Sequence, residues 1–250
     1  MCEGETRMKV HLVAAGKFHD IDFARLEVLK LLAEHAEIRA SVSSDYADVD
    51  RIAAADLLIT YTCDLMPTSD QTAMLREWVE QGGRWLALHG TNSVLRFAQD
   101  GVIDTPDEQP AFTQLLGTRF AGHPPIAPFK VAVTRGDPVM TRGLRDFRIE
   151  DELYLTHRTA DIDVLLHTSF TGTCEEFRDA QWDDPQVPVL YERTLGKGAI
   201  LYLTLGHCRG HYDLQPIAGF WPHPQRCAWN YPVFYDLLRR GIGWGRPHLG

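Results

Sequence analysis

The sequence predicts an α/β fold built on a doubly wound, mostly parallel sheet, flavodoxin-like or class I glutamine amidotransferase-like, with a strand-rich second half. Short apolar runs alternate with helical stretches over residues 9–98, and this alternation favours parallel strands joined by right-handed crossovers. Strand candidates dominate from residue 129 onward. The 250 residues suffice for one or two domains. Because no repeat or low-complexity linker divides the chain, we expect a single domain over residues 1–250.

Apolar periodicity defines the expected elements of the first half. Expected strands cover residues 9–15, 38–42, 56–62 and 84–89, and expected helices cover 23–35, 48–55 and 69–81. Ser69 is the expected N-cap of the third helix, and Gly82 ends that helix. The unbroken apolar run 84–89 is typical of a strand that is buried on both faces.

The second half is less regular. Expected strands cover residues 129–134, 147–155, 164–168, 187–192 and 199–205, and expected helices cover 112–116 and 231–244. Gly172 is an expected turn between two of these strands. Residues 208–230 are expected to form a loop, because they are rich in proline, histidine and aromatic residues.

The composition excludes several classes of partner. Asp and Glu outnumber Lys and Arg by 34 to 25, and a formal charge of -9 repels phosphate backbones, so we expect no nucleic acid partner. No apolar run approaches the roughly 18 residues of a membrane span, and the acidic start does not resemble a signal peptide. We expect a cytoplasmic protein with a small-molecule partner and no membrane contact; a homo-oligomer is left open.

Polar residues follow several of the expected strands. In an open α/β sheet, ligands bind beyond the carboxyl ends of the strands, and His19, Cys63, His89 and His207 all stand at such ends. His89 is the most informative, because an apolar strand turns there into Gly-Thr-Asn-Ser, as at a nucleophile elbow. An imidazole at that turn can bind a metal, act as a general base, bind substrate, or simply cap the turn.

The sequence resembles the trehalose-utilisation (ThuA-like) family, whose fold is similar to that of class I glutamine amidotransferases. The segments that carry the resemblance lie in the family's order: residues 82–89, 120–124, 137–138, 151–154, 188–191, 196–198, 203–207 and 240–244. Gly90 departs from the family's Ala, and Asp137-Pro138 replaces a His-Pro pair. The resemblance implies action on a sugar or keto-sugar, such as a trehalose-type disaccharide derivative, in carbohydrate catabolism. It does not imply glutaminase activity, because His89 replaces the nucleophilic Cys.

Four separated side chains are candidate metal ligands: His89, His123, Glu152 and His207. Three imidazoles and a carboxylate suit divalent Zn, Mn, Fe or Ni and leave a coordination position for water. His89, Glu152 and His207 are also the catalytic candidates, for water activation or proton transfer. In the alternative, His123 only orders its loop and Asp151-Glu152 form a salt bridge at a strand edge. Because neighbouring strand residues face opposite sides, we expect only one of these two carboxylates to reach the site.

Substrate contacts are expected from His19, His123, Tyr154, Trp182 and Trp221. The two tryptophans and Trp229 lie in polar or proline-rich stretches without an evident face to pack on, and an indole stacks well on the C–H face of a sugar ring. Ordinary loop packing is the alternative for each tryptophan, and a solvated loop is the alternative for His19.

Further readings of the sequence concern other groups. His207, Cys208 and His211 form a weaker ligand set, because Gly210 disfavours a helix that would align them. A hydrolase that uses Cys63 as its nucleophile is a third hypothesis. A non-catalytic sugar-binding or interaction module on an amidotransferase-like scaffold is the main alternative to an enzyme.

Overall fold

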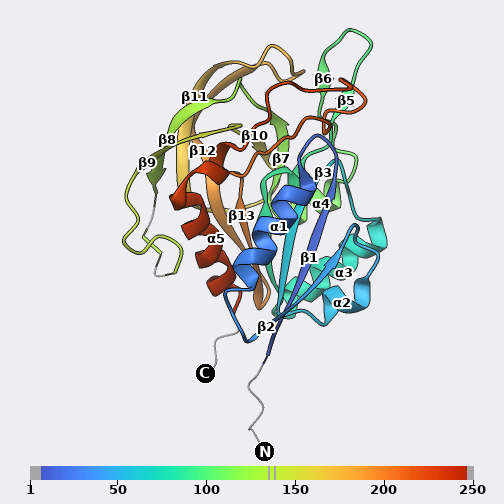
Figure 1. Ribbon diagram of the computed structural model, residues 1–250, viewed down its shortest axis with the longest axis vertical. Coiled ribbons are helices and arrows are strands. Elements are labelled where there is room, and N and C mark those ends of the chain that lie inside the picture. Colours follow the sequence, from blue (N-terminus) through green and yellow to red (C-terminus); the bar gives the residue numbers. More distant parts are fainter. Residues whose placement is uncertain (1–6, 135, 138, 247–250) are drawn as a thin grey trace, which may run out of the picture.

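A nine-stranded mixed sheet forms the centre of the computed structural model, which describes residues 7–134, 136–137 and 139–246 (Figure 1). The strands are arranged in the order β2-β1-β3-β4-β13-β12-β11-β8-β9. Pro138, part of one of the segments that carry the family resemblance, lies outside the described residues. Among the described residues, no helix has the length and apolar character needed to cross a bilayer.

The first five strands of this order run parallel to one another. They are β2 (Ile38–Ser43), β1 (Met8–Gly16), β3 (Leu57–Cys63), β4 (Arg84–Leu88) and β13 (Gly198–Leu203). β3, β4 and β13 are buried almost along their whole lengths, as the apolar runs predict. The sequence prediction of a parallel sheet is confirmed for this part.

The remaining strands pair antiparallel, so the sheet as a whole is mixed rather than mostly parallel. They are β12 (Gln181–Leu195), β11 (Asp163–Thr173), β8 (Ala127–Val133) and β9 (Phe147–Asp151). Gly172 does not form the expected turn, because it lies inside β11 and pairs with Trp182. Two small sheets went unpredicted: β5 (Arg96–Phe97) with β6 (Ile103–Asp104), and β7 (Thr118–Gly122) with β10 (Leu155–Arg158).

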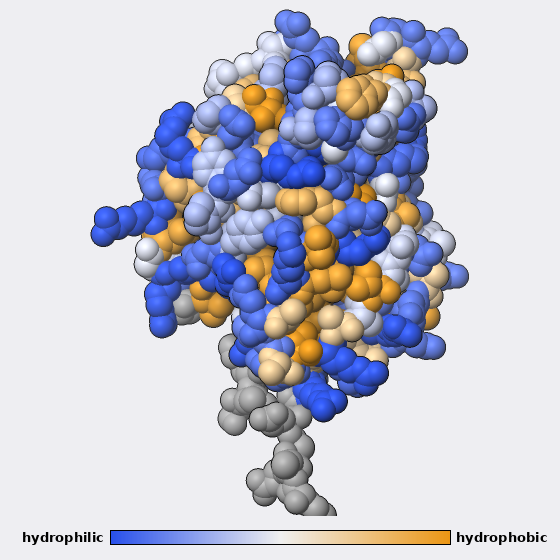
Figure 2. Space-filling view, viewed as in Figure 1, coloured by the Kyte–Doolittle hydropathy of each residue, from blue (hydrophilic) through white to orange (hydrophobic). Residues whose placement is uncertain are grey.

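Helices cover both faces of the parallel part. On one face, α1 (Ile21–Leu32) and α5 (Pro232–Trp244) share an apolar core and lie side by side in Figure 1. On the other face, α2 (Val49–Ala53), α3 (Ser69–Glu80) and α4 (Pro110–Leu116) share a second core. The N-cap of α3 is Thr68 rather than Ser69, because Thr68 and Gln71 form a reciprocal capping box. Figure 2 shows that hydrophilic residues surround a smaller hydrophobic area on the face viewed.

Candidate metal centre

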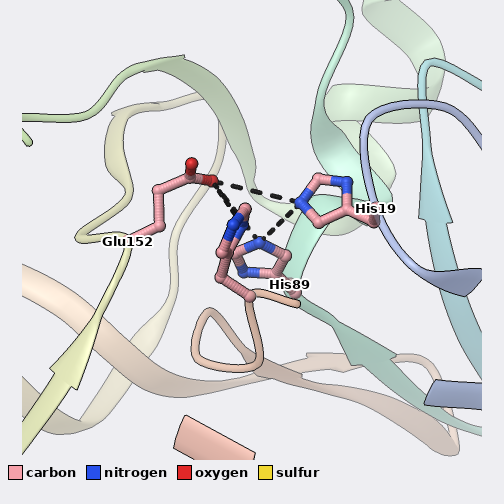
Figure 3. A group of neighbouring side chains, drawn as sticks. His19, His89 and Glu152 are labelled. Atoms are coloured by element: carbon pink, nitrogen blue, oxygen red, sulfur yellow. Dashed lines mark hydrogen bonds and ion pairs between the residues drawn. The ribbon is translucent and has the colours of Figure 1, made fainter. Parts of the chain in front are cut away.

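Four buried side chains converge above the carboxyl ends of the parallel strands (Figure 3). His19 follows β1, His89 follows β4 directly, and His207 follows β13. Glu152 comes from the segment between β9 and β10, in the antiparallel part. One ligand atom from each of these four residues lies within 4.8 Å of the corresponding atoms of the others. The ends of three parallel strands therefore bring three imidazoles to one place, among them His89 and His207, which the sequence places together.

The turn at His89 has the tight geometry of an elbow. His89 opens the single 3-10 turn η1 (His89–Asn92) with a φ of 44°, in the left-handed region that non-glycine residues rarely adopt. The Tyr202 hydroxyl donates to the carbonyl oxygen of His89 at 2.6 Å and so holds the turn. A Cβ on Gly90 would lie 2.6 Å from the carbonyl oxygen of Thr62. This close approach of β3 explains why glycine stands where the family pattern has alanine.

Hydrogen bonds fix the proton positions on His19 and His89. His89 Nδ1 lies 2.8 Å from the carbonyl oxygen of Thr204, and His19 Nδ1 lies 3.1 Å from that of Lys17. A carbonyl oxygen only accepts, so each Nδ1 carries the proton and each Nε2 of the neutral ring carries a lone pair. The two Nε2 atoms are 2.9 Å apart. Two lone pairs at that distance repel each other unless a cation lies between them.

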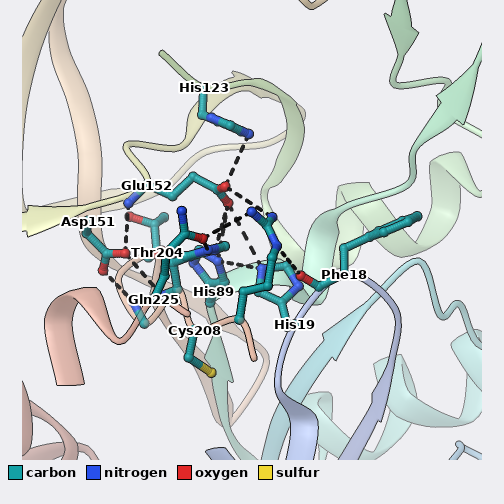
Figure 4. Close-up of polar contacts among 12 residues, drawn as sticks. Phe18, His19, His89, His123, Asp151, Glu152, Thr204, Cys208 and Gln225 are labelled. Atoms are coloured by element: carbon teal, nitrogen blue, oxygen red, sulfur yellow. Dashed lines mark hydrogen bonds and ion pairs between the residues drawn. The ribbon is translucent and has the colours of Figure 1, made fainter. Parts of the chain in front are cut away.

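His207 presents a third lone pair to the same point. Its Nε2–H donates to Oε1 of Gln225 at 2.9 Å, which leaves Nδ1 unprotonated (Figure 4). Nδ1 is buried without a hydrogen-bond donor among the described residues, and it lies 3.2 Å from Oε2 of Glu152. Both of these atoms are acceptors. A buried acceptor that faces a carboxylate oxygen is a suitable position for a cation.

Burial and neighbouring charges shift the pKa values of His19 and Glu152 in the cluster. Burial lowers the pKa of His19 well below its ordinary value, so this imidazole is neutral at pH 7. Burial alone would raise the pKa of Glu152, but His123 and His207 outweigh that effect and hold it well below its usual range. A neutral His19 and an ionised Glu152 are the protonation states that a divalent cation requires of these two ligands.

Each imidazole also has the second hydrogen bond that is typical of metal-binding histidines. The ring N–H that points away from the cluster is donated to a carbonyl oxygen of Lys17, Thr204 or the Gln225 side chain, which fixes the ring orientation. Nitrogen and oxygen donors of this kind suit Zn, Mn, Fe or Ni. The residues therefore fit a divalent transition metal.

The membership of the cluster differs from the sequence prediction at one position. His19, expected as a substrate contact or in a solvated loop, is 5% exposed and belongs to the group of four. His123, expected as a metal ligand, lies outside this group, and its Nε2 is 3.2 Å from Oε1 of Glu152. Tyr154 is buried, and its ring packs 4.2 Å from the ring of His89. A substrate contact by Tyr154 stays a prediction.

Of the two adjacent carboxylates, Glu152 belongs to the group of four, whereas Asp151 accepts hydrogen bonds from the backbone beside that group. The predicted strand 147–155 breaks after Asp151, because the Asp151 carboxylate accepts from the backbone N–H of Glu152. The same carboxylate accepts from the N–H of Gly206 at 2.7 Å and from that of His207 at 3.0 Å. Asp151 thereby ties the antiparallel part to the end of β13, next to His207.

The tryptophans have ordinary packing contacts. Trp229 is buried in the main core against Phe23 and Phe234, which agrees with the alternative of ordinary packing. Trp182 lies within β12 rather than in a loop, and its Nε1–H donates to the carbonyl oxygen of Asp179. Trp221 lies in the loop before η2 (Cys227–Asn230), and its backbone N–H donates to His211. Sugar stacking by Trp182 and Trp221 stays a prediction.

The other predicted groups do not assemble into a second centre. His211 donates to the carbonyl oxygen of Trp221, and the thiol of Cys208 lies 3.1 Å from the Tyr61 hydroxyl, so neither joins His207 as a ligand set. Cys63 is buried, and burial raises the pKa of its thiol well above the ordinary value. A thiol that resists ionisation is a poor nucleophile, which argues against the hydrolase hypothesis.

Sequence reasoning missed Arg209. This residue stands two positions after His207, and its Nη2 is 3.9 Å from Oε1 of Glu152. Its position two residues after a histidine predicted to lie at a strand end is the sequence feature that could have indicated a role for Arg209 in the site. Arg209 and His123 approach Oε1 of Glu152, whereas the three imidazoles approach Oε2.

The chain belongs to the ThuA family, described as trehalose utilisation, whose model matches residues 9–220. A ThuA-like protein from Bacteroides uniformis is similar in structure, with 17% identity, a TM-score of 0.63, and coverage of 98% of this chain and 94% of that one. A ThuA-like protein from Parabacteroides merdae has 15% identity, a TM-score of 0.61, and coverage of 96% and 90%.

A Thermoplasma acidophilum protein described as part of a GMP synthase has 12% identity and a TM-score of 0.51, with coverage of 97% of this chain and 96% of that one. At these identities the similar structures show the fold alone. A comparison with curated proteins gave no match.

Proposed function

We propose that the protein is a metal-assisted enzyme of carbohydrate catabolism that acts on a sugar or keto-sugar, such as a trehalose-type disaccharide derivative. The convergence of three imidazole lone pairs and one carboxylate in a buried site carries this proposal. The carbohydrate class is supported by family membership. We also propose an amidotransferase-like scaffold without glutaminase activity, and a cytoplasmic location.

In this proposal the residues divide into two groups. His19, His89, His207 and Glu152 hold the ion, which supplies a Lewis acid that polarises a sugar carbonyl or hydroxyl or activates water. His123 faces the substrate from the other oxygen of Glu152, and at 21% its side chain is more exposed than those of the four ligands.

Elemental analysis of the purified protein tests the metal. We expect one Zn, Mn, Fe or Ni per chain, and we expect His89→Gln and His207→Gln to lose it. His11→Gln is the matched control, because His11 is also a buried histidine of the parallel part, but its two ring nitrogens contact the hydroxyls of Ser41 and Ser43. A metal-free protein, or metal retained in both ligand variants, would contradict the proposal.

The reaction itself is tested by incubating the metal-loaded protein with trehalose and with its keto derivative and following both by NMR. We expect conversion of at least one sugar, and we expect it to stop when a chelator removes the ion. Binding without conversion would favour the alternative of a non-catalytic sugar-binding module.

A further inference from the structure

Among the described side chains that pair with Glu152, two are appreciably exposed. The side chains of His89 and His207 are 0% exposed and those of His19 and Glu152 are 4% exposed, whereas Arg209 is 14% and His123 is 21% exposed. A ligand that approaches the cluster from solvent therefore meets Arg209 and His123 first.

Arg209 is held in a fixed orientation by hydrogen bonds from two of its three guanidinium nitrogens. Its Nε–H donates to the carbonyl oxygen of Phe18 and its Nη1 donates to Oε1 of Gln225, both at 3.1 Å. The backbone of Arg209 also pairs with that of Gln225 in both directions. Nη2 has no hydrogen-bond partner among the described residues, and it points toward Glu152 from 3.9 Å, beyond hydrogen-bond distance. The free donors of Arg209 thus face the cluster.

The charge of Arg209 is not balanced by a carboxylate of its own. Within the described part of the chain, Glu152 is the carboxylate within 4.0 Å of its guanidinium, and in the proposed centre Glu152 neutralises the ion. The neighbouring acidic residue Asp20 is paired with Arg226 at 2.8 Å, and Asp213 accepts from the backbone N–H of Gly210. With Glu152 bound to the proposed ion, the partly buried positive charge of Arg209 would have no anionic partner, and burying an unpaired charge is costly.

We propose that Arg209 is a substrate-binding residue and that the sugar on which this site acts carries a carboxylate, which Arg209 binds through Nη2. A guanidinium whose Nε and Nη1 are already held presents its free Nη2 to a carboxylate oxygen with little further loss of side-chain freedom. The inference rests on the proposed function, because it places the substrate at the metal centre, and it narrows the substrate class to sugar acids.

Calorimetric binding to two matched pairs of probes tests this inference. D-gluconate and D-glucitol differ at the carboxylate, as do D-glucuronate and D-glucose in their ring forms. We expect the wild-type protein to bind the acid of at least one pair about 10- to 100-fold more tightly than the neutral partner, the range of one charge-assisted hydrogen bond or more. We expect Arg209→Gln to lose this preference and to keep its affinity for the neutral sugar.

Arg239→Gln is the control for lost charge, because Arg239 is an exposed residue of α5 that pairs with Glu34. If Arg209→Gln does not fold, Arg209→Lys is the second variant, because lysine retains the positive charge but lacks the planar guanidinium. We expect its preference for the sugar acid over the neutral sugar to be about tenfold smaller than that of the wild-type protein. The inference would be overturned if the wild-type protein bound the sugar acid no more tightly than the neutral sugar. It would also be overturned if a folded Arg209→Gln variant kept the wild-type preference for the acid.

Metal content is measured on the same samples, which keeps the two proposals apart. Loss of acid preference in Arg209→Gln with one metal per chain retained supports the inference. A metal-bound wild-type protein with no acid preference overturns the sugar-acid inference alone. A metal-free protein overturns the metal centre, whatever the probes show.

Discussion

The parallel and antiparallel parts of the sheet contribute to the centre in different ways. His19, His89 and His207 come from the ends of β1, β4 and β13, where parallel topology alone brings strand ends to one edge. Glu152 comes from the antiparallel part and reaches the same point only because β9 ends at Asp151. Imidazole placement is therefore a property of the topology, whereas carboxylate placement depends on one local break in a strand.

Removing the carboxylate contributed by the antiparallel part has the largest expected effect. Glu152→Gln keeps the shape of the side chain and removes its charge. Four-ligand zinc sites contribute about 10–16 kcal/mol, so one ligand accounts for about 3 kcal/mol, or about 100-fold in metal affinity. Competition with a chromogenic chelator measures the change.

Glu150→Gln is the control for that change, because Glu150 is an exposed carboxylate of β9, two residues before Glu152. Equal metal affinity in Glu152→Gln and Glu150→Gln would show that the three imidazoles suffice to bind the metal. The metal would then be held by the parallel part of the sheet alone.

The sequence predicts the parallel part of the sheet better than the antiparallel part. The parallel strands and the helices that cover them follow from apolar periodicity, because burial imposes that pattern on each segment separately. The break after Asp151 depends on a side chain that bonds its neighbour's backbone, and β7 and β10 need each other as partners. Such features depend on tertiary contacts, which cannot be inferred from the local pattern of apolar and polar residues.

The same reasoning explains the errors at the site. His89 and His207 were identified because strand ends are visible in the sequence. His19 is expected as a substrate contact, with a solvated loop as the alternative, because the sequence does not show that the carbonyl oxygen of Lys17 orients its ring into a buried cluster. Arg209 was missed because its role depends on Phe18 and Gln225, which are distant in the chain.

Gly90→Ala, in the parallel part, tests whether the turn at His89 depends on close contact with the backbone of β3. Gly90→Ala places a Cβ 2.6 Å from the carbonyl oxygen of Thr62, which a well-packed core does not accommodate. We expect a loss of about 1–3 kcal/mol in the free energy of unfolding, measured with urea, together with weaker metal binding through the displaced His89.

Gly243→Ala provides the reference for Gly90→Ala, since Gly243 lies in α5 with open space around the added Cβ. Alanine favours a helix over glycine, so this variant should be neutral or slightly more stable. An equally harmless Gly90→Ala would mean that β3 can move away from the turn.

The link between the two parts is tested at Asp151. Asp151→Asn retains one acceptor oxygen for the two N–H groups of Gly206 and His207, so the end of β13 is held less firmly. Groups that orient metal ligands typically contribute 10–100-fold in affinity, and because one acceptor remains we expect a loss of about tenfold. Asp183→Asn, at an exposed carboxylate of β12, should leave affinity unchanged. Unchanged affinity in Asp151→Asn would mean that the two parts are aligned by strand pairing alone.

The smallest expected effect concerns His11, a histidine of β1 that stands apart from the centre. Burial lowers its pKa from the ordinary value of 6.5, although Asp48 partly opposes the shift. As the pH falls below about 6.5, the unfolded chain takes up a proton that the folded chain resists, so this residue lowers the free energy of unfolding toward acid pH. His11→Gln lacks this titration, and the stability of the wild-type protein relative to this variant should decline between pH 7.5 and pH 5 in urea unfolding. A relative stability that stays constant would mean that the Ser41 and Ser43 hydroxyls accept from a protonated ring as readily as they bond a neutral one. Burial in the parallel part would then not be what keeps an imidazole neutral, and the neutral state of His19 would require the ion itself.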